Sequence, residues 1–294
     1  MTLDQLINKA TNKQNFNTIN DYICFCLEYL EFIEKGLQAI VVSRNENNYI
    51  FYQYKEDADY AYSRPINKNL MLDIETFNKN CNLFLESLKN IKDLKNEPEK
   101  RILINKIVYT CQQSIGATLD ALPSRKNNTA RKINGDLFEK FIRMIISQIG
   151  IDVTEGNQKI PVKIDNEIQC YMNYQHDLII KKEENLCAIG SVKTSSKDRL
   201  DKIFIDKFIY NKLSDLDIPH FAIFLNDVQR KGVQPNLGIN STFLSGHFKG
   251  YTIKLNPLDG VYYCDLRPVM EQDSLLKQTI KTFDCLIIED IWNF

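Results

Sequence analysis

The sequence lacks an excess of charge of either sign and lacks the segments that mark secreted or membrane proteins. Its 294 residues include 37 lysines and arginines against 38 aspartates and glutamates, a net charge of −1. Overall charge therefore neither favours nor excludes nucleic acid, because basic residues can gather on one face of a neutral protein. No apolar run reaches the roughly 18 residues of a membrane span. The start, MTLDQLINKA, lacks a signal peptide's basic and then apolar pattern. We therefore expect a soluble, cytoplasmic protein.

The cysteines also lack the spacing of a metal site. The sequence has eight of them, at positions 24, 26, 81, 111, 170, 187, 264 and 285. The only close pair is Cys24 and Cys26, and no second pair follows at the spacing of a zinc finger. Most of the eight lie among apolar residues, so we expect reduced thiols that are mostly buried.

What the chain does contain is enough apolar sequence, 44%, for one large domain or two in close contact. We interpret residues 1–122 as a mostly helical N-terminal region. The hydrophobic patterns there predict a helix over 19–39 ending near Gly36, a hairpin within 40–64 turning at 45–48, and two amphipathic helices over 69–94 and 98–121.

After residue 122 the hydrophobic pattern changes, first to a polar and basic segment and later to the alternation of β-strands. Residues 123–135, PSRKNNTARKING, are polar and basic and predict a loop. A helix is expected from Asp136 to Gln148, with Asn134 or Asp136 as its cap and Gly150 as its stop. The hydrophobic period then shifts from 3.6 to 2, which predicts strands over 151–154, 159–164, 167–171, 176–181 and 186–193, a helix over about 198–213, a central strand over 221–225 and a helix near 271–282. This order predicts an α/β fold with a mixed β-sheet flanked by helices.

One pair of residues in these strands has the chemistry of phosphodiester hydrolysis. Asp177 opens the strand DLIIKK, and Lys193 closes the strand AIGSVK sixteen residues later. Two antiparallel strands joined by a short turn place such residues side by side. Ser191 lies two residues before Lys193 and shares its face. Hydrolysis of a phosphodiester needs carboxylates that hold a divalent cation, and a further cation that stabilises developing charge.

This pattern resembles the signature of the PD-(D/E)XK nucleases, an Asp followed by a hairpin and then acid-X-Lys. His176 stands where the family has Pro, and Ser191 stands where it usually has an acid. Type II restriction endonucleases that recognise sequences built on CCGG also place a non-acidic residue there, and they take the carboxylate from the following helix. The segment KTSSKDRLDKIFID resembles that branch and implies Asp206 as the displaced acid, with Asp201 as the alternative. A salt bridge of Asp206 with Lys202 or Lys207 is the other interpretation of that residue.

A second match lies upstream. The segment NGDLFE, residues 134–139, resembles the Gly-X-X-Phe-Glu start of the helix before the hairpin in such nucleases, where the Glu points at the metal. The resemblance covers about residues 130–225, and we interpret residues 123–294 as the nuclease domain. Residues 1–122 would then serve in DNA binding or dimerisation. It implies a type II restriction endonuclease in which Asp177, Asp206 and Glu139 bind Mg²⁺. Lys193 would orient the attacking water, and the products would carry a 5′-phosphate and a 3′-hydroxyl.

The same interpretation predicts contacts with double-stranded DNA. We expect Lys197 and Arg199 to recognise guanine in the major groove, and Asp198 to accept from cytosine or to cap the helix. The basic stretch before residue 135 is expected to contact phosphates or to be a solvated linker, through Arg125, Lys126, Arg131 and Lys132. By analogy with this superfamily, Arg230 follows the central strand at a sheet end where DNA binds.

A palindromic target would favour a homodimer. Two alternatives stay open at this point. One is a structure-specific repair or recombination nuclease of the same fold. The other is a catalytically inactive DNA-binding protein in which Ser191 marks a decayed site.

Overall fold

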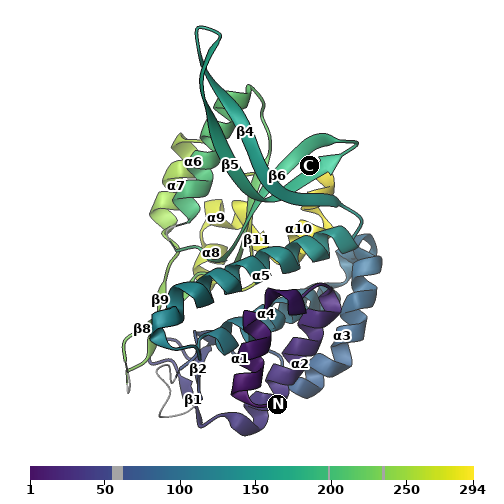
Figure 1. The fold of residues 1–294 in the computed structure, drawn as a ribbon, viewed down its shortest axis with the longest axis vertical. Helices are drawn as coiled ribbons and strands as arrows, with labels where there is room; N and C mark the ends of the chain where they lie inside the picture. The colour runs from purple at the N-terminus through teal and green to yellow at the C-terminus, as the bar shows by residue number, and fades with distance from the viewer. Residues whose placement is uncertain (55–61, 198, 234–235) are drawn as a thin grey trace.

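The fold begins with a helical region that carries a small β-sheet, seen in a computed structural model that describes residues 1–54, 62–197, 199–233 and 236–294 (Figure 1). Thr2 and Thr18 close capping boxes that start the first two helices. The elements are α1 (Leu3–Thr11), α2 (Ile19–Gly36), β1 (Ala39–Val42), β2 (Tyr49–Gln53), β3 (Ile66–Asn67), α3 (Ile74–Lys89) and α4 (Pro98–Leu119). The predicted end of α2 at Gly36 and the β1–β2 hairpin are confirmed.

One helix of this region differs from its predicted character. The second amphipathic helix expected over 98–121 is α4, and it is not amphipathic, because nearly every residue from 104 to 119 is buried. It packs against α1, α2, α3 and α5 and so lies at the centre of the helical region. A helix surrounded on all sides needs no polar face, and the sequence pattern alone does not reveal how many neighbours it has.

The second half of the chain is organised by a six-stranded sheet with the order β11-β10-β7-β6-β5-β4. Strands β4 to β6 are antiparallel, and β6, β7, β10 and β11 are parallel. The strands are β4 (Asp152–Ile164), β5 (Glu167–Lys182), β6 (Asn185–Ser195), β7 (His220–Asn226), β10 (Gly260–Tyr263) and β11 (Ile280–Thr282). All seven residues of β7 are buried, as predicted for a central strand. The predicted α/β fold with a mixed sheet is confirmed.

The helix before this sheet starts earlier than predicted. Residues 123–135 were expected to form a loop, but α5 spans Asn127–Gln148, and only a 3₁₀ turn at Ser124–Lys126 precedes it. Ala130 and Asn134 are buried in its first turns. The Gln112 amide of α4 donates to the side chain and carbonyl oxygens of Asn134, at 2.9 and 3.1 Å. Packing on α4 therefore holds a polar stretch in a helix that its own sequence does not favour.

The remaining elements flank the sheet. They are α6 (Leu200–Ser214), β8 (Val228–Lys231), β9 (Gly238–Ser241), α7 (Ser245–Lys254), α8 (Pro268–Gln272), α9 (Ser274–Thr279) and α10 (Phe283–Ile288). The single helix predicted near 271–282 is wrong. Two short helices and β11 take its place, because Asp273 ends α8 and accepts hydrogen bonds from the first amides of α9.

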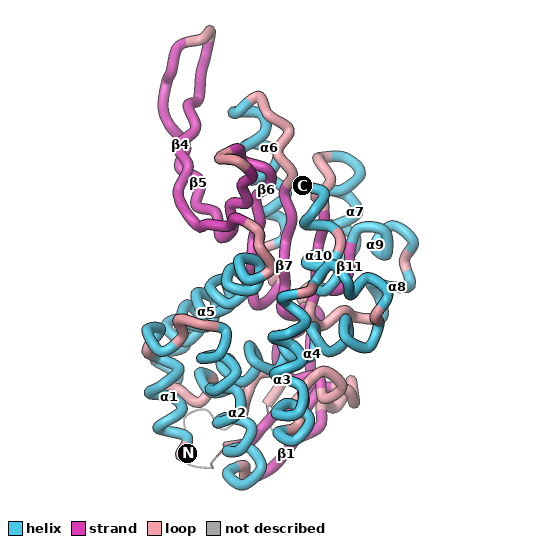
Figure 2. Tube along the Cα trace, turned by 90° about the vertical axis from the view of Figure 1, so that its right-hand side faces the viewer, coloured by secondary structure: helices cyan, strands magenta, loops and turns pink. Residues whose placement is uncertain are grey.

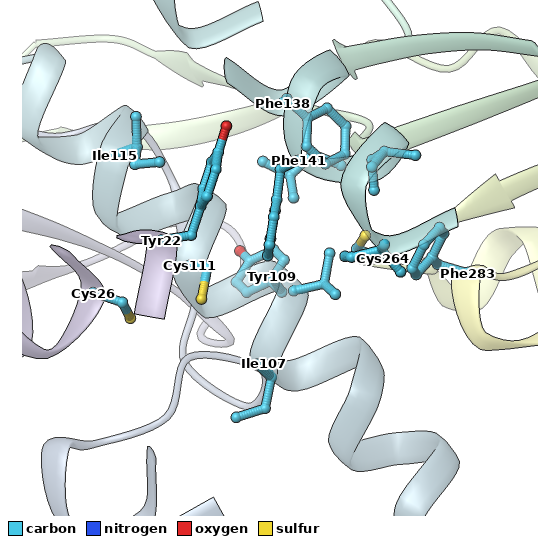
Figure 3. Packing of buried hydrophobic residues seen from close by; sticks show 14 of the residues in the cluster. Tyr22, Cys26, Ile107, Tyr109, Cys111, Ile115, Phe138, Phe141, Cys264 and Phe283 are labelled. Atoms are coloured by element: carbon cyan, nitrogen blue, oxygen red, sulfur yellow. The ribbon is translucent and has the colours of Figure 1, made fainter. Parts of the chain in front are cut away.

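A continuous hydrophobic core joins the two parts of the chain on either side of the 122/123 boundary. Figure 3 shows its middle, where Tyr22 of α2 stacks on Phe141 of α5 with ring centroids 4.3 Å apart. The Tyr22 hydroxyl also donates to the carbonyl oxygen of Leu137, at 2.9 Å. The cysteines of the described residues are free thiols, and none of the described helices is long and apolar enough to cross a membrane.

Candidate active site

Three charged side chains meet on the sheet beneath α5. The Lys193 ammonium on β6 donates to Asp177 Oδ2 on β5 at 2.5 Å and to Glu139 Oε1 on α5 at 2.9 Å. The three groups come from positions far apart in the sequence, and the ammonium bridges both carboxylates. Sequence reasoning selected all three residues, and the structure brings them together.

The pairing of β5 with β6 sets this geometry. Leu178 lies opposite Gly190, so the next residues toward the site are Asp177 and Ser191, and Lys193 reaches back along the same face. Asp177 Oδ2 also accepts a hydrogen bond from the Val192 amide at 2.8 Å, which fixes the carboxylate against the neighbouring strand. The strands are joined by a tight turn in which Glu183 and Glu184 both have positive φ.

The electrostatics of the three groups are coupled. Burial by itself would lower the pKa of Lys193, but Asp177 and Glu139 outweigh it and the pKa is raised. Lys193 is therefore a cation at neutral pH. Burial, followed by the negative charge of Asp177, raises the pKa of Glu139. Two carboxylates held this close repel each other, so the arrangement favours a bound cation beside Lys193.

The structure does not bring Asp206 into this group. Successive residues of a strand point to opposite faces, and the face opposite Asp177 carries His176, whose ring lies 5.5 Å from that of Tyr210 on α6. Asp206 is on the same helix, where its charge acts on Tyr174 and its nearest cation is Lys202, at 3.9 Å. That contact is the salt bridge considered as the other interpretation.

The alternative acid, Asp201, has a different neighbour from the three-residue group. It lies 3.9 Å from His247 Nδ1. Within the described ranges, no group of three or more His, Cys, Asp or Glu side chains is placed to hold a metal ion. A metal between Asp177 and Glu139 would therefore have two carboxylates from this chain.

The predicted DNA-contacting residues lie on several elements. Lys197 and Arg199 are exposed where β6 passes into α6, and Asp198 lies outside the described residues. Arg125 and Lys126 are exposed in the turn before α5, whereas Arg131 and Lys132 are exposed on α5 itself and not in a loop. Arg230 is exposed on β8, and its guanidinium donates to the carbonyl oxygen of Tyr62, at 3.0 Å.

A second polar cluster, which sequence reasoning missed, lies at the ends of the parallel strands. Asp265 follows β10, is almost fully buried and accepts hydrogen bonds from Tyr49 Oη at 2.9 Å and Asn67 Nδ2 at 2.8 Å. Arg267 pairs with Glu46 at 2.7 Å. These contacts tie β2 and β3 to the main sheet. The signal in the sequence is an acid directly after a buried strand, but its partners lie some 200 positions away.

The sheet order, the helices on it and the helical N-terminal region together define a restriction-endonuclease-like fold. The chain is similar in structure to the Type IIP restriction endonuclease Kpn2I, with a TM-score of 0.73 and 18% sequence identity, over 99% of this chain and 97% of that one.

A second, weaker likeness is to the restriction endonuclease PspGI in a complex with substrate DNA. Its TM-score is 0.45 with 14% identity, over 74% of this chain and 89% of that one. No protein-family model matches the chain, and no curated protein matches it in sequence. At 18% identity, the likeness to Kpn2I shows that the two chains share a fold.

Proposed function

We propose that this protein is a type II restriction endonuclease that hydrolyses phosphodiester bonds of double-stranded DNA with Mg²⁺. The observation that carries the proposal is the Lys193 ammonium held between Asp177 and Glu139. That trio lies on a fold similar in structure to that of the restriction endonuclease Kpn2I. A lysine and two carboxylates are the groups that this hydrolysis requires from a protein.

The donor set suits Mg²⁺. This ion takes one or two carboxylates and completes its shell with water and substrate oxygens. In the part of the chain that the structure describes, Asp177 Oδ1 and Glu139 Oε2 accept no hydrogen bond and are the oxygens available to it. Bound there, Mg²⁺ would neutralise phosphate charge and make a water molecule more acidic.

Each residue of the trio then has a separate role. Asp177, fixed by the Val192 amide, would hold the ion from β5. Glu139, whose other carboxylate oxygen accepts from Lys193, would hold it from α5. Lys193, whose pKa is raised, donates hydrogen bonds as a cation and does not act as a base. It would hold the attacking water and stabilise charge that develops on the phosphate.

Recognition is assigned to the start of α6. Lys197 and Arg199 would read G·C pairs, and Arg125, Lys126, Arg131 and Lys132 would contact phosphates near the start of α5, where free amides favour anions. A palindromic target would be bound by a homodimer, because a two-fold site matches a two-fold protein. Ser191 in the usual acid position favours the CCGG-recognising branch as the model for this recognition.

The test is digestion of plain duplex plasmid with and without Mg²⁺, followed by sequencing of the ends. We expect discrete fragments that require the metal. Asp177→Ala and Lys193→Ala should each abolish cleavage without altering the fold, and Asp177→Ala should also weaken binding of the metal. Lys202→Ala, on exposed α6 surface, is the matched control and should cleave as the wild type does.

Other results would reject the proposal in distinguishable ways. Cleavage of branched or damaged DNA alone would indicate a repair nuclease of the same fold. Binding without cleavage under any metal would indicate an inactive DNA-binding protein. Near wild-type cleavage by Asp177→Ala or Lys193→Ala would place the catalytic centre elsewhere.

A further inference from the structure

The hairpin of β4 and β5 extends well beyond the body of the protein in both views (Figures 1 and 2). We call its outer part, residues 157–175, the arm. The pairing of β5 with β6 covers Leu178–Lys182, whereas the arm is held by the pairing of β5 with β4. A two-stranded ribbon gains little stability from its own contacts, so the chemistry of its two faces indicates what each face meets.

One face of the arm is turned toward α6. Ile160 and Tyr174 are buried there in a cluster with Tyr210. Met172 pairs with Ile160 across the hairpin and so belongs to the same face. Gln158 also lies on this face, where its side chain accepts a hydrogen bond from the Tyr210 hydroxyl at 2.6 Å. The base of this face is therefore covered by the protein itself.

The opposite face carries three cross-strand pairs, Asn157 with Gln175, Lys159 with Asn173, and Pro161 with Tyr171. Successive residues of a strand alternate between faces, so these six residues point away from Ile160 and Tyr174. All of them except Pro161 are exposed. We call these six residues the polar face.

The polar face begins at the candidate active site. Asp177 follows His176, which lies on the face toward α6, so Asp177 shares the face of Gln175. At about 3.3 Å per residue, Tyr171 lies roughly 20 Å from Asp177 along the strand. One strand of a duplex advances about 3.4 Å per nucleotide. The polar face is therefore long enough to follow about six base pairs outward from the trio.

The side chains of the polar face suit duplex DNA. Asparagine and glutamine amides form paired hydrogen bonds with adenine, and the major groove admits a two-stranded β-ribbon. Lysine and tyrosine donate to phosphate oxygens. The polar face has one cation, Lys159, and no acid, since Asp165 and Glu167 lie beyond it at the tip, beside Lys163. In the described parts of the chain, Lys159 forms no ion pair that would compete with a phosphate.

We propose that the polar face of the arm lies in the major groove of the DNA beside the cleaved phosphate, with its amides at base edges and Lys159 and Tyr171 at phosphates. This inference rests on the proposed function, because the duplex has to cross the trio. It gives the base pairs that flank the cleavage point a second set of contacts, separate from Lys197 and Arg199 at the start of α6.

The first experiment measures binding of the full chain to a long duplex of mixed sequence, without divalent metal, at several salt concentrations. Lys159→Ala/Tyr171→Ala should raise the Kd by about tenfold and lower the slope of log K against log salt by about 1, because a phosphate contact is lost. The matched control is Lys182→Ala/Met172→Ala. It removes an exposed lysine and a large side chain from the same strand but not from the polar face, and should change the Kd by less than about twofold.

The second experiment tests the groove and the amides. The same duplex is made with 7-deazaadenine, which lacks the N7 acceptor that adenine presents in the major groove. The wild type should bind this duplex more weakly than the unmodified one. Asn173→Ala/Gln175→Ala should bind both duplexes equally, because the amides that use the acceptor are gone. A wild type indifferent to the modification, or a variant that still responds to it, would overturn the placement in the major groove.

Failure of the arm is distinguishable from failure of the nuclease assignment. A wild type that binds no duplex would reject both. Duplex binding by the wild type that is equally affected by the polar-face variant and its control would overturn the arm alone, and would leave the cleavage tests of Asp177 and Lys193 as they stand. Weaker self-association of Lys159→Ala/Tyr171→Ala in sedimentation velocity, with unchanged DNA binding, would assign the face to a protein partner and also overturn the proposal. Equal thermal unfolding temperatures of the variant and the control show that the fold is intact in both.

Discussion

At the scale of single residues, the sequence suggested two carboxylates, Glu139 and Asp206, beside Asp177 and Lys193, and the structure brings only Glu139 into contact with Lys193. Glu139 contacts Lys193, whereas Asp206 lies near Lys202 and Tyr174 on the side of α6. Glu139→Gln should lower single-turnover cleavage by about 100-fold or more, because it removes the charge of a carboxylate proposed to bind the metal. Asp206→Asn should lower it by less than about tenfold. The reverse ranking would show that the α6 carboxylate reaches the metal once DNA is bound.

Asp265 gives a prediction about pH and stability. Burial raises its pKa to about 6 from an ordinary value of 3.8. The folded protein therefore keeps this proton to higher pH than the unfolded chain does, and stability falls as pH rises from about 4 to about 6. The loss amounts to about 3 kcal/mol and is complete above that range.

Urea unfolding of the wild type and of Asp265→Asn at several pH values measures this effect. Asparagine stays neutral and still offers an oxygen to Tyr49 or Asn67. The variant should therefore lack this part of the decline between pH 4 and pH 6. Parallel pH profiles of the two proteins would show that Asp265 is ionised throughout.

At the scale of elements, the junction of β6 and α6 determines where the proposed recognition residues lie. The Ser196 and Thr242 hydroxyls are 2.9 Å apart, and the contact fixes the junction at the end of β6, the strand that carries Lys193. Arg199 stands exposed at the start of α6, only a few residues beyond Lys193. In the proposed function, its distance from the cleaved phosphate would therefore be limited by the few residues that separate it from Lys193.

Arg199→Ala should weaken binding to the target duplex far more than binding to a scrambled duplex, since a bidentate contact with guanine is worth about 1–3 kcal/mol. Lys126→Ala is the comparison. If Lys126 touches only phosphate, its loss should weaken both complexes about equally and flatten the salt dependence. Binding assays on both duplexes at two salt concentrations measure the difference. Equal losses for Arg199→Ala would assign that residue to the backbone and remove the main support for CCGG-type recognition.

At the scale of the whole molecule, ion pairs and a cation–π contact join the helical N-terminal region to the last residues of the chain. Arg101 of α4 pairs with Asp284 and Glu289 near the C-terminus, each at 2.6 Å. Asp284 is almost fully buried and would be left without its cation if Arg101 were lost. Lys92 lies over the ring of Trp292, the single tryptophan, so that fluorescence reports on the same region.

Arg101→Met should lower the free energy of unfolding by about 3–5 kcal/mol, because a buried carboxylate loses its partner. Lys100→Met, which breaks only the exposed pair with Glu97, should change it by less than about 1 kcal/mol. Tryptophan fluorescence and far-UV circular dichroism should report one shared transition in both variants. Separate transitions would show that residues 1–122 and 123–294 unfold independently, contrary to their continuous core.

The sequence by itself determined much of the site. Alternating strands around a short turn fix which residues face each other, so the meeting of Asp177 with Lys193 followed from local pattern. The match in residues 134–139 selected Glu139, and its carboxylate accepts a hydrogen bond from Lys193. The mixed α/β class followed from the order of elements.

Tertiary structure alone decided the rest. The first turns of α5 are helical because α4 buries Ala130 and Asn134, and a polar sequence carries no sign of that partner. Asp206 shares a helix face with Lys202 in the sequence, but its distance from Asp177 depends on which side of the sheet α6 covers. The links of Asp265 with Tyr49 and Asn67 likewise join distant segments. Local pattern fixes what chain neighbours do, whereas packing between remote elements arises only when the whole core forms.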